Sequence, residues 1–253
     1  MAECVIVFAK NPVPSEVKTR LIPFLSADQA ASLYKAFLID WCDALSTLTV
    51  HRESEVRREG EAPAELYPPE EPHPSVHLVI AYTPSNSRCA LQALIGQKAI
   101  YIPQVGVDLG ERLISAAQWA YEQNYAKFLF VGSDSPTLPI QYVECALGLL
   151  DSRDVVIGPS MDGGYYLIGF SAGGAVLAIP AIFEDITWST DLVFRQTLEK
   201  VQSVNARLGL LPPWYDVDTF ADLQLLRNHL FAMRLAGEKI PAPQTDSKLA
   251  ECL

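Results

Sequence analysis

Apolar residues fall into short continuous runs that alternate with longer segments in which they recur at helical spacing. Residues 4–9 (CVIVFA) are apolar throughout, which is typical of a strand buried on both faces of a parallel sheet. A helix is predicted from Ser26 to about Leu48, because serine is a suitable N-cap and the apolar positions that follow lie on one helical face. The same criteria predict strands at 76–82, 99–103, 128–131, 154–158 and 165–170, an extended segment at 206–211, helices at 108–124, 140–150 and 191–201, and a last helix that begins near Thr219.

This alternation of strands and helices predicts an α/β fold with a mostly parallel, doubly wound sheet. The length of 253 residues suits one large domain of this class. Residues 51–75 break the pattern, since they contain five prolines, many charged residues and almost no apolar ones. We interpret them as a flexible insertion within a single domain that spans residues 1–235, with residues 236–253 as a C-terminal tail.

Composition limits the classes of partner and the cellular setting. The net charge is −11, with 19 basic and 30 acidic residues, so the surface should repel nucleic acid and anionic lipid. No apolar run reaches the ~18 residues of a membrane span, and the first residues lack the features of a signal peptide. The five cysteines are scattered without a CxxC pair, which disfavours disulfides and structural zinc. We therefore expect a cytoplasmic protein without nucleic acid or membrane partners, whose oligomeric state the sequence leaves open.

Positive charge is concentrated at one place, the loop that follows the first predicted strand. Lys10, Lys18 and Arg20 lie there with a single acidic residue, Glu16. Ligands of open α/β sheets bind beyond the carboxyl ends of the strands, so these cations are placed to hold the phosphates of a small anion. The loop matches neither GxxxxGK[ST] nor GxGxxG, which disfavours a Walker-type ATPase and a conventional dinucleotide dehydrogenase. An ordinary charged turn into the next helix is the alternative interpretation.

The segment GSDSPTLP, at 132–139, follows the predicted central strand at 128–131. A carboxylate at the carboxyl end of a central strand can ligate Mg²⁺ or Mn²⁺, which prefer oxygen ligands, and Asp134 is in this position. Ser133 beside it is a candidate for the substrate pocket. Capping of the following turn by Asp134 is the alternative explanation.

The segment SMDGGYY, at 160–166, leads into the predicted strand at 165–170. Paired glycines permit close approach of the backbone to a ligand, so we place Gly163, Gly164 and Tyr165 in the candidate substrate pocket. Asp162 in front of them could meet a ribose, a sugar hydroxyl or a metal ion. A hairpin turn that uses Asp-Gly explains the same residues without a ligand.

The segment DVDT, at 216–219, precedes the last predicted helix. Alternate residues of an extended segment point the same way, so Asp216 and Asp218 could face one cation. Two like charges this close repel unless a positive charge lies between them, which favours a cation. Thr219 and Asp222 are explained by capping of the helix.

Taken in order, five segments of the chain resemble a bacterial family of predicted glycosyltransferases that is commonly classed as a domain of unknown function. Its members are often described as transferases associated with radical-SAM or selenium-domain proteins. The family is similar to the wider GT-A group, which contains sugar-nucleotide transferases and small-molecule nucleotidyltransferases. The resemblance therefore implies a GT-A-like, nucleotide-diphospho-sugar transferase fold. The matching segments are FAKNPVPSEVKTRL, FLFVGSDSPTLP, GPSMDGGYYLIGF, IFEDITWST and YDVDTFADL.

The resemblance also implies roles for individual residues. Asp134 matches the metal-binding aspartate after the central strand, and Asp218 matches the second metal ligand before the final helix. Lys18 and Arg20 match the basic residues of the nucleotide-phosphate loop. Ser15 departs from the family pattern, which usually has glycine there, and so does the proline-rich insertion.

We therefore expect a transferase that uses a nucleotide-activated small-molecule donor, an acceptor that the sequence does not name, and Mg²⁺ or Mn²⁺ held by Asp134 and Asp218. The leading hypothesis is a glycosyltransferase with a nucleoside-diphosphate sugar, in which Asp162 or Asp216 orients the acceptor or acts as a base. The first alternative is a nucleotidyltransferase that joins an NTP to a small acceptor and releases pyrophosphate, against which the shortage of glycine in the first loop counts modestly. The second is a non-catalytic nucleotide-sugar-binding protein.

Overall fold

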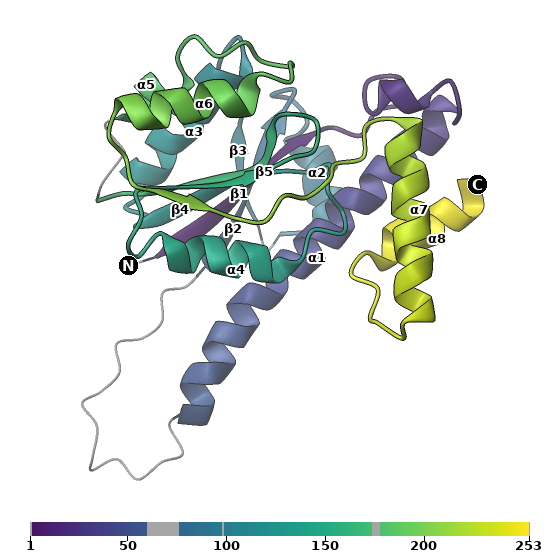
Figure 1. Cartoon of the computed structure of the whole chain (residues 1–253). Helices are drawn as coiled ribbons and strands as arrows, with labels where there is room; N and C mark the ends of the chain where they lie inside the picture. The colour runs from purple at the N-terminus through teal and green to yellow at the C-terminus, as the bar shows by residue number, and fades with distance from the viewer. Residues whose placement is uncertain (1, 60–75, 98, 174–177, 253) are drawn as a thin grey trace.

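A seven-stranded sheet lies at the centre of the part of the chain that the structure describes (Figure 1). The structure is a computed structural model that describes residues 2–59, 76–97, 99–173 and 178–252. The strand order is β3-β2-β1-β4-β6-β5-β7. The strands are β1 (Glu3–Lys10), β2 (Val76–Thr83), β3 (Ile100–Pro103), β4 (Lys127–Gly132), β5 (Val155–Pro159), β6 (Tyr165–Ser171) and β7 (Leu208–Leu210).

The strand pairing fixes the class of the fold. β1 pairs in parallel with β2 on one side and with β4 on the other, and β2 pairs in parallel with β3. β6 is antiparallel to both β4 and β5, and β5 is parallel to β7. Over the described residues the sheet is mostly parallel with one reversed strand, which confirms the predicted doubly wound α/β fold. The strand order reverses between β1 and β4, and such a reversal creates a crevice at the carboxyl ends of the strands.

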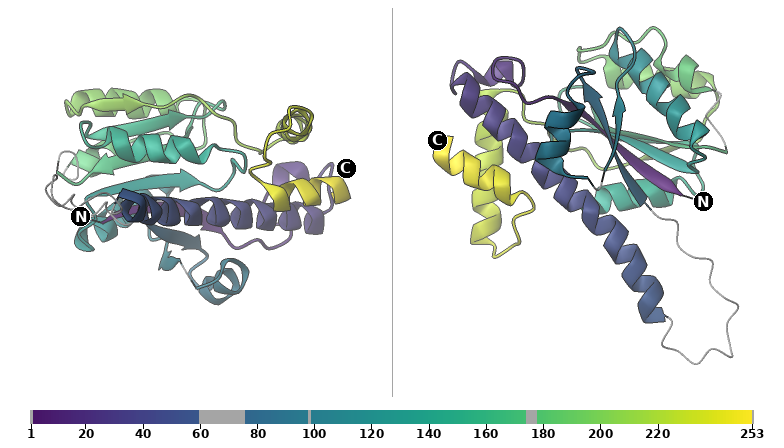
Figure 2. Two further views of the ribbon diagram at one scale, coloured as in Figure 1. Left: turned by 90° about the horizontal axis from the view of Figure 1, so that it is seen from below. Right: turned by 180° about the vertical axis from the view of Figure 1, so that it is seen from behind.

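Helices cover both faces of the sheet, as the three views show together (Figures 1 and 2). Successive residues of β1 point to opposite faces, so Val5 and Val7 join the core beneath α1 and α4, whereas Cys4 and Ile6 join the core beneath α3, α5 and α6. The described helices are α1 (Ala27–Glu59), α2 (Arg88–Ile95), α3 (Leu109–Glu122), α4 (Ile140–Leu149), α5 (Ile179–Phe183), α6 (Val193–Ser203), α7 (Phe220–Leu235) and α8 (Pro243–Cys252), with a short 3₁₀ turn, η1 (Thr19–Leu21).

The predicted strands and long helices are present, with differences at their ends. Helix α1 continues to Glu59, so residues 51–59 extend this helix where the proline-rich insertion was expected to begin. Residues 60–75, the rest of that insertion, lie outside the described residues. The sequence pattern does not predict α2 and α5, because helices this short show too little periodicity.

The last residues form helix α8, which packs against α1 and α7 where the sequence suggested a tail. Asp40 on α1 anchors its first turn, since its carboxylate accepts hydrogen bonds from the backbone N–H groups of Gln244 (3.0 Å) and Thr245 (2.7 Å). Leu249 of α8 is buried in the core beneath α1. Neither α8 nor any other helix in the described ranges is long and apolar enough to cross a membrane.

Candidate active site

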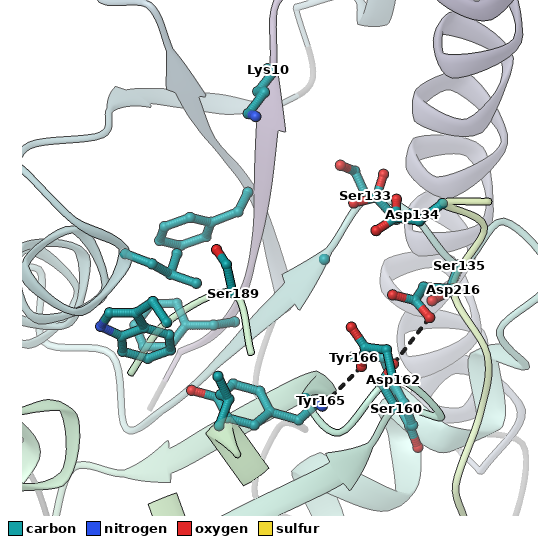
Figure 3. A pocket seen from close by; sticks show the side chains of 18 of the residues that line it. Lys10, Ser133, Asp134, Ser135, Ser160, Asp162, Tyr165, Tyr166, Ser189 and Asp216 are labelled. Atoms are coloured by element: carbon teal, nitrogen blue, oxygen red, sulfur yellow. Dashed lines mark hydrogen bonds between the residues drawn. The ribbon is translucent and has the colours of Figure 1, made fainter. Parts of the chain in front are cut away.

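A cavity of about 850 Å³ opens at the carboxyl ends of β1 and β4, where the strand order reverses. This volume lies within the usual range for small-molecule sites. The loops after β1, β3, β4, β5 and β7 and the segment 188–191 contribute to its wall besides the strand ends, and Figure 3 shows labelled side chains from several of these segments around the same space. The lining includes almost every residue predicted for the site: Lys10, Lys18, Arg20, Ser133, Asp134, Asp162, Gly164, Tyr165, Asp216 and Asp218.

Lys18 lies between the two predicted metal ligands. Its ammonium group forms an ion pair with Asp134 and a second with Asp218 Oδ1 (2.9 Å), and it donates a hydrogen bond to the carbonyl oxygen of Val217 (2.7 Å). All three ammonium protons therefore have an acceptor. The group also lies over the rings of Tyr34 and Phe37 on α1, 5.9 and 5.6 Å from their centroids, which adds a cation–π contribution.

The charges of this cluster stabilise one another. Burial by itself would lower the pKa of Lys18, but the carboxylates of Asp134 and Asp218 outweigh it and raise that pKa, so the amine is protonated. Burial alone would raise the pKa of Asp218, and the neighbouring Lys18 and Arg20 cations lower it instead. Lys18 itself has a left-handed backbone (φ 48°), and so does Ser15 (φ 69°), the position at which the related family usually has glycine.

Asp134 and Asp218 fit a divalent cation. Both carboxylates are partly exposed to the cavity, at 41% and 37% of the side-chain surface, and both reach a single ammonium ion, so one metal ion can contact them together. Among the described residues there is no cluster of three or more acidic, histidine or cysteine ligands. A two-carboxylate site suits Mg²⁺, which completes its octahedron with water and substrate phosphate oxygens.

Of the other predicted residues in this half of the cavity, Arg20 and Lys10 are exposed and Ser133 is buried. Arg20 is exposed and its guanidinium lies 3.7 Å from Asp218. The side chain of Lys10 is also exposed, while its backbone N–H donates to the hydroxyl of Tyr34 (3.1 Å). That hydroxyl lies 2.7 Å from Ser133 Oγ, and Ser133 is buried. Ser133 therefore fixes the loop after β4 through Tyr34 and offers little surface to a ligand.

Asp216 and Asp218 have different partners, contrary to the expectation that both face one cation. Ser160 Oγ donates a hydrogen bond to Asp216 (3.1 Å), whereas the ammonium group of Lys18 lies between Asp218 and Asp134. Burial, followed by the charges of Asp162 and Asp218, raises the pKa of Asp216 to about 6. The alternation of side chains along one segment could not predict this, because the second carboxylate that contacts Lys18 is Asp134, which comes from a distant loop.

The β5–β6 connection is a tight turn, which bears out the hairpin interpretation of the Asp-Gly motif. The N–H of Ser160 donates to Gly164 O (3.1 Å), and Asp162 accepts a hydrogen bond from the N–H of Gly164 (2.8 Å). Asp162 nevertheless lines the cavity, so turn and site are not exclusive. Figure 3 shows Asp162 and Asp216 on the same side of the cavity.

Gly163 differs from its neighbour and is absent from the cavity lining. It has φ +89°, and a Cβ atom there would collide with the carbonyl oxygen and Cα of Asp191. Its own carbonyl oxygen accepts a hydrogen bond from the N–H of Phe194 (2.8 Å). The predicted role of Gly163 in the pocket is thus indirect, because it lets residues 188–191 approach the turn.

Residues 188–191 form a wall of the cavity across from Asp134, as Ser189 shows in Figure 3, and the sequence analysis gave them no role. Trp188, Ser189, Thr190 and Asp191 all line the cavity. A Cβ atom on Gly110, in the first turn of α3, would come within 2.9 Å of Trp188 Nε1, so this glycine lets the indole pack closely there. The signal was available in the segment IFEDITWST, which matched the related family but carries no recognisable chemistry.

The comparisons with known proteins agree with this fold. A family model described as "Uncharacterized protein conserved in bacteria (DUF2064)" matches residues 71–190. A solved structure from Desulfovibrio desulfuricans G20, of a protein assigned as a nucleotide-diphospho-sugar transferase, is 31% identical and superimposes with a TM-score of 0.77 over 99% of this chain and 98% of that one. The chain belongs to the DUF2064 family. The association with radical-SAM or selenium-domain proteins stays a prediction.

One further relative and one solved structure of the same fold are also similar to this DUF2064 protein. The 3-phospho-D-glycerate guanylyltransferase of Phenylobacterium zucineum (strain HLK1) is 32% identical over 158 residues, which make up 62% of this chain and 62% of that protein. The match thus spans less than two thirds of the curated relative. A cytidylyltransferase from Leptospira borgpetersenii serovar Hardjo-bovis (strain JB197) is 11% identical with a TM-score of 0.51 over 99% of this chain and 95% of that one, and shares the fold.

Proposed function

We propose that this DUF2064 protein is a nucleotidyltransferase, which transfers a nucleoside monophosphate from an NTP to a small phosphorylated or carboxylated acceptor. An acceptor oxygen forms a bond to the α-phosphorus, the bond from that phosphorus to the β-phosphate oxygen breaks, and pyrophosphate leaves. The observation that carries the proposal is the cavity wall in which the cationic β1 loop faces Asp134 and Asp218 at the reversal of the strand order.

The β1 loop is suited to a polyphosphate. Lys10, Lys18 and Arg20 all line the cavity, and among the other charged lining residues only Arg112 is basic, so an anion is attracted to this loop in particular. The last two positions also match the phosphate loop of the related family. We assign the triphosphate of the donor to this end.

Asp134 and Asp218 would hold Mg²⁺ or Mn²⁺. Such an ion supplies positive charge to phosphate oxygens, which lowers the free energy of the charge that develops on the leaving pyrophosphate. Both aspartates project into the cavity from separate segments that a backbone hydrogen bond joins, Val217 N–H to Asp134 O (2.9 Å).

The acceptor is assigned to the opposite half of the cavity, between Asp162, Asp216 and residues 188–191. Their carboxylates are placed to accept hydrogen bonds from hydroxyl groups of the acceptor and so to orient it. The named activity of the Phenylobacterium relative makes 3-phospho-D-glycerate and GTP the first substrates to test.

Glycosyl transfer, the leading hypothesis from the sequence, becomes the second candidate. The relative from Desulfovibrio, matched over 98% of its length, is assigned to the nucleotide-diphospho-sugar transferases, and Asp162 and Asp216 line the cavity as candidate bases for an acceptor hydroxyl. The curated relative with a named reaction favours nucleotidyl transfer, which reverses the order of the two hypotheses.

A pyrophosphate-release assay separates the candidates. The protein is incubated with Mn²⁺, each of four NTPs and 3-phospho-D-glycerate or related phosphorylated and carboxylated acids, and in parallel with UDP-, GDP-, CDP- and ADP-sugars. Acceptor-dependent pyrophosphate release that is lost in Asp134→Asn supports the proposal. Release of a nucleoside diphosphate from one sugar donor, without pyrophosphate from any NTP, would replace it with glycosyl transfer.

A further inference from the structure

We propose that Lys18 is an exchangeable counter-ion of the candidate metal site: its ammonium group occupies the shared position between Asp134 and Asp218, and a divalent cation must displace it to bind. This inference rests on the proposed metal-dependent transfer. It goes beyond that transfer in one respect: the binding of the metal ion and the position of the Lys18 side chain are coupled.

The first argument is geometric. Lys18 makes an ion pair with Asp134 and another with Asp218 Oδ1 at 2.9 Å, and these are the two carboxylates that fit a metal ion. A metal ion that binds both would lie within about 2.1 Å of an oxygen from each. The ammonium nitrogen and the metal ion therefore compete for the same oxygens and for the same space.

The second argument concerns charge. The two carboxylates carry two negative charges, which Lys18 offsets by one, with Arg20 farther away at 3.7 Å from Asp218. A divalent ion neutralises both, after which an ammonium group so close to it would be repelled instead of attracted. The electrostatic balance that holds Lys18 in place is therefore reversed when the ion arrives.

The third argument is that the cavity offers space for the displaced side chain of Lys18. The side chain is only 4% exposed, yet it already lines the cavity, and its neighbours Thr19 and Arg20 are exposed. A displaced Lys18 enters the half of the cavity assigned to the donor phosphates.

The test uses Mn²⁺ alone, so its outcome does not depend on the identity of the substrates. Free Mn²⁺ is measured by electron paramagnetic resonance during titration of wild type, Lys18→Met and Lys10→Met. The second variant is the matched control, because Lys10 contributes the same charge to the cavity wall from an exposed position. We expect Lys18→Met to bind Mn²⁺ about tenfold more tightly or better, and Lys10→Met to change the affinity much less.

A labelling experiment on the wild-type protein keeps the inference testable if Lys18→Met does not fold. Lysines are acylated briefly with and without Mn²⁺, and modification is read at each residue by mass spectrometry. We expect Lys18 to be protected without Mn²⁺ and labelled with it, while Lys10 is labelled equally in both. Tighter binding in neither variant, an equal gain in both variants, or a Lys18 that stays protected at the highest Mn²⁺ concentration would each overturn the inference. Failure here leaves the pyrophosphate assay unaffected, and failure of that assay leaves this binding result standing.

Discussion

The backbone N–H of Val217 donates a hydrogen bond of 2.9 Å to the carbonyl oxygen of Asp134. This bond joins the loop after β4 to the segment before α7, and it involves no side chain of either residue. The backbone on which the two candidate metal ligands stand is therefore held independently of their carboxylates. Substitutions of those carboxylates test the chemistry of the site more than the folding of the chain.

Replacement of Asp134 by asparagine is expected to lower the rate of transfer by about a hundredfold or more, because it removes one of two negative ligands for the metal ion. The fold should persist, since the Val217 hydrogen bond remains. Steady-state rates and circular dichroism check the two parts. Asp43→Asn, an exposed change on α1, serves as the control and should retain full activity. Full activity of Asp134→Asn would remove Asp134 from the proposed metal site.

Gly163→Ala is expected to destabilise the protein by about 1–3 kcal/mol, because a side chain there combines a left-handed backbone with a collision against Asp191. Gly164→Ala is the matched control: its φ is ordinary and its Cβ would meet Asp162 Oδ1 at 3.2 Å, a side-chain atom that can shift. Thermal unfolding of the two variants measures the difference. Equal stability of both would show that residues 188–191 are free to move away from the turn.

Asp40→Ala is expected to cost about 1 kcal/mol and to loosen α8, since it removes the acceptor for two N–H groups of the first turn of that helix. Asp43→Ala, three residues along α1 and exposed, should leave stability within about 0.5 kcal/mol of the wild type. Hydrogen exchange at the amides of Gln244 and Thr245 locates the effect. Unchanged protection of these amides would mean that α8 is held by its apolar contacts alone.

Tyr34→Phe is expected to cost about 1–2 kcal/mol, because the backbone N–H of Lys10 and the buried hydroxyl of Ser133 both lose a partner. Tyr121→Phe, at an exposed position, is the control and should be nearly neutral. Chemical denaturation of both variants measures the difference. A neutral Tyr34→Phe would indicate that water replaces the lost hydroxyl.

Asp154→Asn is expected to reduce stability at neutral pH, because Asp154 accepts three hydrogen bonds from Arg207, at 2.8, 3.0 and 2.7 Å. These bonds hold the pKa of Asp154 below its ordinary value, so the fold favours the ionised form. The contribution is fully present above the unfolded pKa of about 3.9 and is lost as the pH falls through the lower folded pKa. Denaturation midpoints of wild type and Asp154→Asn should therefore converge at acid pH. Glu199→Gln, which breaks the exposed pair with Arg195, should have a much smaller effect.

The fold was predictable because its strands are buried on both faces, and continuous apolar runs such as CVIVFA record that burial directly. Helix α8 was not predictable in this way, because its first turn is held by the carboxylate of Asp40, which lies far away in the sequence. The extension of α1 to Glu59 was also not predicted. Its last residues are mostly charged and the helix is only weakly amphipathic, so the sequence pattern does not distinguish this part of the helix from a loop.

The cavity residues were predictable one loop at a time, and the family resemblance also paired Asp134 with Asp218 as metal ligands. What the sequence did not predict is that the ammonium group of Lys18 lies between these two carboxylates. Residues 188–190 lie in the segment IFEDITWST, which matched the related family, but their residue types indicated no particular chemistry, so this wall of the cavity was not predicted.

The reversed strand β6 has a consequence for how such a protein can diversify. In a purely parallel sheet each strand leaves the carboxyl edge through a long crossover connection, whereas β5 is joined to β6 at that edge by a tight turn, which lies beside Asp216. Apart from Gly163, which its backbone conformation and its contact with Asp191 restrict, the residues of such a turn can change without disturbing the strand order. Under the proposed function, changes in this one turn would alter the acceptor half of the cavity, while the β1 loop assigned to the donor phosphates keeps its sequence.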